Sequence, residues 1–233
     1  MSVQMSAVER LRSLPDVFTS NNMSSIFGMS RASVDNTIAR WRKAGLVETM
    51  GMRKAGVHFN LLRRPDAHDA LMSDALWLLL RVPHVLGGGG ALHAAGWTTQ
   101  RHHVHEVCVG VSTRSPCVPT GLTGVNVLAR PIKWMSILFQ NAEANEQASG
   151  GIPMLSPAMA LADSWLANQR GTGRVANTRM AWLPDSDDVE IPSEEEWMCA
   201  VDCLRLLGAS DEEVADFTNT YENSVEDTNA LSI

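Results

Sequence analysis

Apolar residues recur at helical spacing in the first quarter of the chain and predict three short helices. The first covers about residues 5–13 and stops before Pro15, because the residue preceding a proline avoids helical backbone. The second carries Met23, Ile26 and Phe27. Residues that favour a helix start or end flank the second and third helices: Thr19 or Ser20, Gly28, Ser30 and Gly45.

The third helix lies within SRASVDNTIARWRKAGLV, residues 30–47, and has an unusual choice of side chains. Val34, Ile38 and Trp41 fall at i, i+4 and i+7 and predict a narrow buried stripe. An ordinary exposed helix surface alternates Glu and Lys, whereas this one has Ser, Thr and Asn, which are poor helix formers. Those side chains are useful if they hydrogen-bond base edges in the major groove of DNA. The residues turned outward would be Ala32, Ser33, Asn36, Thr37, Arg40 and Lys43.

Two short strands, LVETM and VHFNLL, follow the third helix and are joined by GMRKAG, residues 51–56. Arg53 and Lys54 would lie at the tip of this hairpin, where they can reach a phosphate or the minor groove. Three helices and a basic hairpin within residues 1–64 predict a winged helix–turn–helix domain. The alternative interpretation is a small helical subdomain with a basic surface.

Residues 65–233 mix helix and strand patterns, so the predicted class is α+β, with a mixed α/β domain after the winged helix. A helix is expected over about 65–81, followed by an extended link and a second helix starting near Gly90. The run Gly87–Gly90 is not a phosphate-binding loop, because no GK[ST] follows; it indicates a close backbone approach or a flexible entry to the helix. Further expectations are a strand over 104–111, one or two strands within 125–139 and a loop over 141–151.

Helices are also expected near the C-terminus. Ser156 and Pro157 predict the start of one whose Leu161, Trp165 and Leu166 would face a core. Two capping boxes, Ser193 with Glu196 and Ser210 with Glu213, predict the starts of two more, the first of which would bury Trp197, Val201 and Leu204. The last dozen residues, ENSVEDTNALSI, are expected to fray.

Charge is distributed unevenly along the chain, although the overall net charge is only −7. Residues 1–64 have a net charge of +6, residues 65–180 of +1, and the acidic helical end, residues 181–233, of −14. The N-terminal quarter would therefore attract phosphate, while the rest of the chain would not. Acids in the first turns of helices explain part of the acidic excess, so a solvated face is favoured over a surface for a basic partner.

Candidate metal and catalytic residues are weak. His103, His105 and Cys108 are residue types that ligate zinc. They could not all bind one ion, because the two histidines would lie on one face of a strand and the cysteine on the other. Cys199 and Cys203 lie four apart on one helix, as small core residues often do. Asp163 and Ser164 lack the surrounding motif of a nucleophile. We therefore expect no metal, no cofactor and no enzymatic activity.

The chain contains no apolar run long enough to cross a bilayer and no apolar signal segment at its N-terminus. Its four cysteines show no metal-type pairs. These features predict a cytoplasmic protein with no membrane association.

Three stretches in this order, SLPDVFTSNNMSSIFGMSRASVDNTIARWRKAGLVETMGMRKAGVHF, PHVLGGGGALHAAGW and MLSPAMALADSW, resemble AbiEi-type antitoxins. These are transcriptional regulators of bacterial type IV toxin–antitoxin systems, with a winged helix followed by an α/β domain. The resemblance covers about residues 13–168, and the acidic end carries no motif of the family. Departures include Gly89 and Gly90, where larger polar residues are usual, and Phe59 in place of a frequent tyrosine. The positions that match the family's motifs are Gly87, Gly88, Ala91, Leu92, Gly96, Ser156, Pro157 and Ala160.

The resemblance implies a repressor that binds inverted repeats in double-stranded DNA upstream of its own operon. Copies of the chain could associate with one another on such repeats. It also implies an antitoxin that opposes a nucleotidyltransferase-type toxin without necessarily forming a tight complex. From the residues themselves, the bases would be read by the start and the outer face of the third helix, and phosphates would be held by its end and by the wing. The predicted DNA-binding residues are Ser30, Arg31, Ser33, Asn36, Thr37 and Arg40, with Lys43, Arg53 and Lys54 on phosphate.

Two alternatives remain at this stage. The first is a winged-helix regulator of another operon whose C-terminal domain binds a ligand or oligomerises, since many unrelated regulators share the N-terminal fold. The second is an enzyme that acts on nucleic acid and is delivered by its winged helix.

Overall fold

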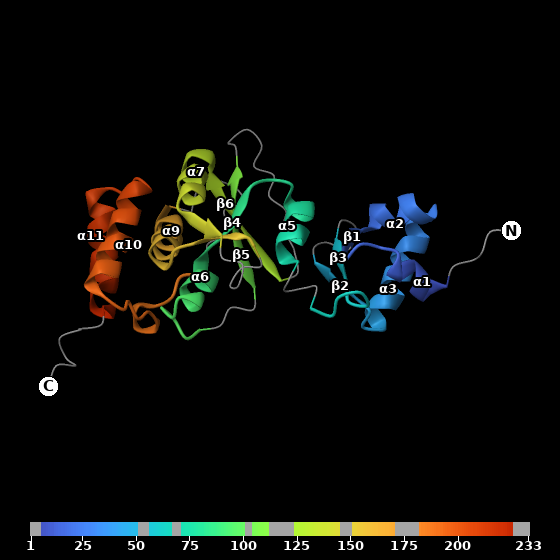
Figure 1. Ribbon diagram of the computed structural model, residues 1–233. Helices are drawn as coiled ribbons and strands as arrows, with labels where there is room; N and C mark the ends of the chain where they lie inside the picture. The colour runs from blue at the N-terminus through green and yellow to red at the C-terminus, as the bar shows by residue number, and fades with distance from the viewer. Residues whose placement is uncertain are drawn as a thin grey trace. The chain divides into compact units, whose positions relative to one another are not determined.

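The computed structural model describes residues 6–50, 56–66, 71–100, 104–111, 124–144, 151–170 and 182–225. The chain forms two compact units, with the main division between Arg81 and Val82. This division falls after the predicted domain boundary at 64/65, so the helix preceding Arg81 belongs to the N-terminal unit. Each unit has its own hydrophobic core, and Figure 1 shows their elements.

The N-terminal unit combines helices with a small antiparallel sheet of order β1-β3-β2. Thr49 on β2 pairs with His58 on β3, and Phe18 on β1 pairs with the same His58 from the other side. Strand β1 was not predicted, because three residues are too few to show an alternating pattern. The elements in chain order are α1 (Ala7–Arg12), β1 (Val17–Thr19), α2 (Ser20–Phe27), α3 (Arg31–Lys43), β2 (Val47–Met50), β3 (Val57–Asn60) and α5 (Met72–Leu80).

The predicted helix ends of this unit are confirmed. Thr19 caps α2 by accepting from the backbone N–H of Asn22, and Gly28 ends that helix with φ +62°. Ser30 caps α3, and Gly45 follows it with φ +68°. These local signals mark where α2 and α3 begin and end.

The C-terminal unit is built on a mixed five-stranded sheet of order β6-β5-β4-β8-β7. The pairs β5–β6 and β4–β8 are parallel, while β4–β5 and β7–β8 are antiparallel. The long pairing of β5 with the edge strand β6 includes the buried residues Val107, Cys108 and Leu128. The strands are β4 (His84–Leu86), β5 (His105–Val111), β6 (Val125–Pro131), β7 (Ala142–Ala144) and β8 (Pro153–Leu155).

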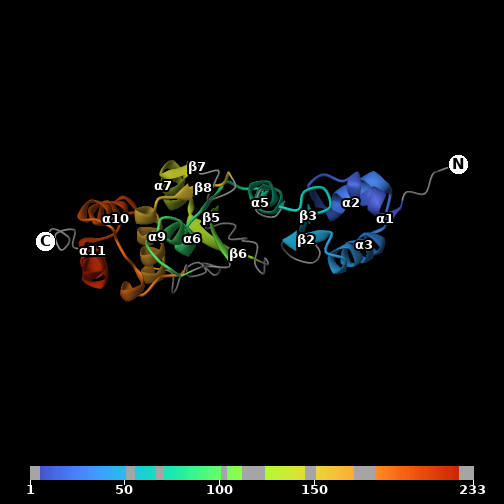
Figure 2. The same cartoon turned by 60° about the horizontal axis from the view of Figure 1, so that its bottom comes forward.

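Helix α9 (Pro157–Arg170) is the centre of the second unit. Every residue from Ala158 to Ala167 is buried, since α9 lies between the sheet and the pair α10–α11, as Figures 1 and 2 both show. The aromatic rings of Trp165, Trp197 and Phe217 join the three helices, with Trp197 stacked on Phe217. The remaining helices are α6 (Gly88–Ala94), α7 (Ile132–Gln140), α10 (Glu194–Leu206), α11 (Asp211–Tyr221) and the 3-10 turns η1 (Ser186–Asp188) and η2 (Glu222–Ser224).

Several element predictions for this half of the chain were wrong. The helix expected over 65–81 begins only at Met72, and Pro65 lies in a turn. Of the one or two strands expected within 125–139, one is found, β6, which ends at Pro131 as expected. The rest of the segment is helix α7, which buries Met135 and Leu138. A single apolar run of this length does not distinguish the two structures.

The other corrections concern segments expected to be irregular. The loop expected over 141–151 contains β7, which pairs with β8. The tail expected to fray is ordered at its start, where η2 is followed by a bridge between Val225 and Ile191. The predicted Ser210–Glu213 capping box is complete. In the predicted Ser193–Glu196 box, the structure records one of the two bonds, from the Glu196 N–H to the Ser193 hydroxyl.

The predicted α+β class is confirmed. Among the described helices, none combines the length and apolar character needed to cross a bilayer.

Candidate nucleic-acid interface

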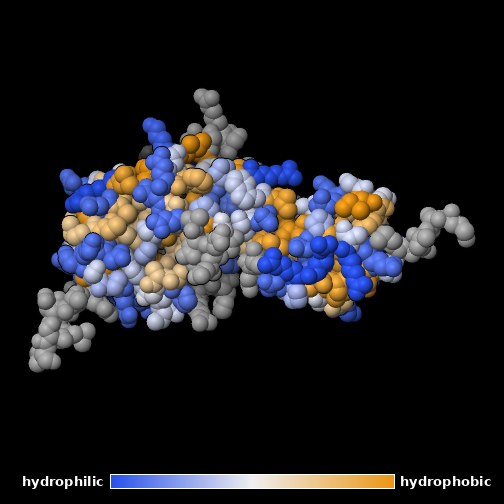
Figure 3. All heavy atoms as spheres, viewed as in Figure 1, coloured by the Kyte–Doolittle hydropathy of each residue, from blue (hydrophilic) through white to orange (hydrophobic). Residues whose placement is uncertain are grey.

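Helix α3 is fixed to the N-terminal unit by one side and leaves the other exposed. Val34, Ile38 and Trp41 are at most 6% exposed and pack in the core with Leu11, Phe18 and Met23 of α1, β1 and α2, as the periodicity predicted. Figure 3 shows strongly hydrophilic residues over the part of this unit where Figure 1 places α3 and β2.

Most of the predicted α3 residues do lie at the surface. Ser33, Asn36 and Arg40 are exposed on one side of the helix, and Lys43 is exposed at its end. Arg40 donates its Nε–H to the carbonyl oxygen of Asn36 at 3.3 Å, which orients the guanidinium along the helix and leaves its other nitrogens available. Ser30 and Arg31 are exposed at the start of the helix, although the Ser30 hydroxyl also accepts from the Ser33 N–H at 3.4 Å.

Thr37 is a correction to the predicted set. It is only 6% exposed, and its hydroxyl donates to the carbonyl oxygen of Ser33 at 2.8 Å. A threonine in a helix commonly forms this bond to the preceding turn. Thr37 therefore belongs to the packed side of α3 and cannot contact a base.

The cations of α3 differ in their surroundings. Arg31 lies 3.7 Å from Asp35, so part of its charge is neutralised, and both side chains are about half exposed. For Arg40, Arg42 and Lys43, no carboxylate within the described ranges lies in ion-pair contact. The end of α3 thus carries a group of exposed positive charges.

The hairpin that follows α3 is present as β2 and β3, but its tip falls in the gap between Met50 and Gly56. Arg53 and Lys54, predicted to hold phosphate, lie outside the described residues. They remain predictions.

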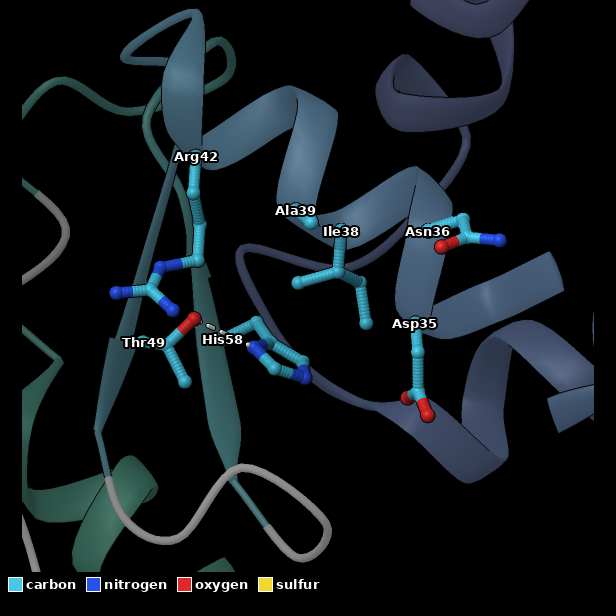
Figure 4. Close-up of a pocket in the computed structure, with 7 residues that line it drawn as sticks. All are labelled: Asp35, Asn36, Ile38, Ala39, Arg42, Thr49 and His58. Carbon is cyan, nitrogen blue, oxygen red and sulfur yellow. Dashed lines mark hydrogen bonds between the residues drawn. The ribbon is translucent and has the colours of Figure 1, made fainter. Parts of the chain in front are cut away.

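A pocket lies between α3 and the β2–β3 sheet, with a volume of about 90 Å³. Figure 4 shows Arg42 and Asp35 from α3, and Thr49 and His58 from the sheet, around it. His58 is 2% exposed; its Nδ1 lies 2.9 Å from Thr49 Oγ1 and its Nε2 lies 3.3 Å from Ser20 Oγ. Burial and, to a lesser extent, the charge of Arg42 lower the pKa of His58 to about 4, although Asp35 partly opposes them. The ring is therefore neutral at neutral pH.

Arg42 and Thr49 are two members of this surface that were not predicted. The signal for Arg42 was present, since it is a cation one residue after Trp41 and two after Arg40 on the same helix. Its placement toward β2 depends on how the sheet packs beside α3. Thr49 had no signal, because a threonine in a short strand is ordinary.

A buried polar cluster in the C-terminal unit joins side chains of β6, α9 and β5. Arg130 donates to both carboxylate oxygens of Asp163 at 2.8 and 2.7 Å, and the Cys108 thiol lies 3.8 Å from the same carboxylate. Burial, followed by the charge of Asp163, raises the pKa of the Cys108 thiol. Arg130 and Asp163 are at most 1% exposed, so no substrate reaches them, and Ser164 beside them is also buried. The cluster is therefore a buried contact between β6 and α9 rather than an accessible site.

A second buried carboxylate, Glu106, explains the glycine run before α6. Its side chain accepts from the backbone N–H of Gly89 at 3.0 Å and of Trp182 at 2.9 Å, and from Asn126 at 3.3 Å. Gly88 has φ +58°, and a Cβ there would overlap Glu106 Oε2. Of the two explanations predicted for the run, the close backbone approach is the one found.

The candidate metal ligands do not come together. Among the residues with described positions, no three His, Cys, Asp or Glu side chains form a group that could hold a metal ion. His103 lies outside them, His105 is exposed and Cys108 is buried. Cys199, expected in the core, is exposed instead.

Comparison with known proteins identifies no family for this chain. No protein-family profile and no curated protein matches its sequence. A structural neighbour is the crystal structure of the RV2827C protein from Mycobacterium tuberculosis, with 15% identity and a TM-score of 0.43 over 92% of this chain and 80% of that one.

Proposed function

We propose that this protein is a DNA-binding transcriptional repressor and antitoxin of a bacterial type IV toxin–antitoxin system. It would act in the cytoplasm, bind inverted repeats upstream of its own operon and oppose a nucleotidyltransferase-type toxin. The observation that carries the DNA-binding part is the surface of α3, where Ser33, Asn36 and Arg40 are exposed beside Arg42 and Lys43, which pair with no carboxylate among the described residues. The antitoxin part rests on the resemblance to AbiEi-type proteins described above.

The order of elements supports a winged-helix mode of binding. Helix α2, a turn at Gly28 and helix α3 precede the hairpin β2–β3, and α1 and β1 complete one core beneath them. A helix of about 10–12 Å in diameter fits the major groove, which is about 12 Å wide. With α3 in the groove, Asn36 would pair with adenine and Arg40 with guanine, while Lys43 would contact a phosphate.

The test is an electrophoretic shift or anisotropy titration of the full chain on its own upstream region over a salt series. If about four to six phosphates are neutralised, the slope of log K against log salt should be roughly −4 to −5. Binding that is independent of salt, or equal on an unrelated duplex, would contradict sequence-specific DNA binding.

Arg40 provides the sharpest single-residue test of this interface. Arg40→Ala should weaken binding to the upstream duplex by about 1–3 kcal/mol and to an unrelated duplex much less, because a guanine contact is lost. Arg12→Ala on α1 removes the same charge from the same unit and serves as the matched control. Equal losses for both variants on both duplexes would show that only charge matters.

The antitoxin role needs its own experiment, because DNA binding does not establish it. Co-expression with the product of the neighbouring gene should rescue growth if that gene encodes a nucleotidyltransferase-type toxin. If growth is not rescued while DNA binding is intact, the antitoxin role is rejected. The protein would then be a regulator of another operon whose C-terminal unit binds a ligand or oligomerises.

A further inference from the structure

The pocket between α3 and the β2–β3 sheet has opposite charges at its two ends. Arg42 lies near Thr49 at one end and Asp35 lies at the other, with the ring of His58 between them (Figure 4). Both charged residues come from α3, seven positions apart, so they lie on the same flank of the helix, about two turns from one another. This flank adjoins the surface proposed to enter the major groove.

Three polar side chains, Ser20, His58 and Thr49, form a chain of hydrogen bonds, and the last two of them line this pocket. Ser20 Oγ lies 3.3 Å from His58 Nε2, and His58 Nδ1 lies 2.9 Å from Thr49 Oγ1. A neutral imidazole has one N–H donor and one bare nitrogen acceptor, so the two bonds must run in the same direction. Either Ser20 donates to His58 and His58 donates to Thr49, or the direction is reversed.

The burial of Ser20 decides the direction. Ser20 is 5% exposed, and the described part of the chain shows no hydrogen-bond partner for its hydroxyl other than His58. If His58 Nε2 carried the proton, the Ser20 O–H would be a buried donor without an acceptor, which is costly. The pattern that satisfies these buried groups has Ser20 donating to Nε2 and Nδ1–H donating to Thr49 Oγ1, which leaves the hydroxyl proton of Thr49 for an acceptor in the pocket.

We propose that Thr49 and Arg42 together hold one backbone phosphate of the bound DNA, with His58 as the positioning residue for the Thr49 hydroxyl. A hydroxyl donor and a guanidinium that line the same end of a pocket match the acceptor oxygens of a phosphate. Asp35 lies at the opposite end, where it repels phosphate, so the anion is confined to the end formed by Arg42 and Thr49. This inference rests on the proposed function, because it assumes that α3 binds DNA.

The experiment uses the full chain and two labelled duplexes, the upstream region and an unrelated sequence, over a salt series. Arg42→Ala should reduce the salt slope by about 1 on both duplexes, since one phosphate contact is lost. Thr49→Val should weaken binding about 3- to 10-fold on both, and Thr49→Ser, which keeps the hydroxyl, should restore it. Arg12→Ala is the charge-matched control and should leave the slope closer to that of the unmodified chain.

The positioning role of His58 has a separate readout that needs no DNA. The nitrogen-15 chemical shifts of the His58 ring should show Nδ1 protonated and Nε2 bare. Ser20→Ala removes the hydrogen bond to Nε2 while changing little else, so the nitrogen-15 shift of Nε2 should change. The ring, then held only at Nδ1, should position the Thr49 hydroxyl less well, and DNA binding should weaken. Combined with Thr49→Val, Ser20→Ala should cause no further loss, because both changes act through one hydroxyl.

The outcomes separate this inference from the function on which it rests. If the unmodified chain does not bind DNA, the proposed function fails. A second outcome is that the unmodified chain binds DNA and that Arg40→Ala weakens this binding. If Arg42→Ala and Thr49→Val then have no effect on binding, the proposed function stands and the phosphate site is rejected. Losses confined to the upstream duplex would also overturn the site, because they would indicate contact with a base.

Discussion

Gly88 shows how one residue can require glycine for two independent reasons. Its φ of +58° is unfavourable for residues with a side chain, and a Cβ would collide with the Glu106 carboxylate, which is buried and bonded to three donors. Gly90, two residues later in the same helix, has open space where its Cβ would be. Two glycines of one run therefore have different roles.

Replacing these two glycines should have opposite effects on stability. Gly88→Ala should destabilise the C-terminal unit by at least about 1–2 kcal/mol from backbone strain alone, with displacement of Glu106 adding to it. Gly90→Ala is the matched control and should be neutral or stabilise by up to about 1 kcal/mol, because alanine favours helix. Denaturant unfolding of both variants checks this, and equal effects would contradict it.

His58 gives the N-terminal unit a dependence on pH. Its pKa is about 4 in the folded protein and 6.5 in an unfolded chain, so the unfolded state binds more protons between these values. The stability that this pKa difference contributes should be fully present above about pH 6.5. As the pH drops toward 4, the free energy of unfolding should fall by up to about 3 kcal/mol. A titration of the His58 ring by NMR with a midpoint near 6.5 would refute this. In His58→Gln the loss between pH 6.5 and 4 should shrink.

At the scale of elements, the buried pair Arg130–Asp163 connects strand β6 to helix α9. The arrangement is bidentate and at most 1% exposed, and Arg130 also lies over the ring of Trp134 at 5.7 Å. Burial would lower the pKa of Arg130, yet the charge of Asp163 raises it overall, so the arginine stays charged. Such a pair is weak evidence for net stabilisation, but breaking it leaves a lone charge in the core.

Asp163→Ala should therefore destabilise the C-terminal unit by about 3–5 kcal/mol. The double variant Arg130→Met with Asp163→Leu removes both charges and should lose considerably less. Thermal or denaturant unfolding measures both. If the single variant unfolds normally but loses a catalytic activity, the cluster would have to be reconsidered as an active site.

The elements also differ in how far sequence patterns predicted them. Helices α2, α3, α9 and α10 were predicted with their starts, because a capping serine or threonine and an apolar stripe act within a few residues. Strand β7 and the bridge at Val225 were not, because each is defined only by its pairing with another segment, β8 and Ile191 respectively. Helix α7 was not predicted, because its apolar run was compatible with a second strand as well as with a helix.

At the scale of the whole molecule, the chain consists of two units with separate cores. Among the described residues, the core cluster of the first unit, which includes Leu11, Phe18, Met23 and Trp41, draws on no residue after Leu62. A unit with its own core is expected to fold independently. The boundary at Arg81, rather than at 64, assigns α5 to the first unit.

A fragment of residues 1–81 should therefore unfold cooperatively and retain DNA binding. At low salt it should bind a duplex more tightly than the full chain does, because the segment with a net charge of −14 is removed. Circular dichroism and the anisotropy titration test the two parts. A fragment of residues 1–64 is the control and should be less stable, since it lacks α5. Equal stability of the two fragments would show that α5 is dispensable.

The sequence by itself determined the α+β class, the length and buried face of α3, the caps of the main helices and the charge difference between the two ends of the chain. All of these depend on neighbouring residues or on composition, so they can be derived without knowing distant contacts. Tertiary structure alone decided that Thr37 is buried, that Arg42 and Thr49 share a pocket, and that Asp163 is paired rather than available. These depend on which elements pack together, because burial and hydrogen bonding between distant residues are properties of the folded core.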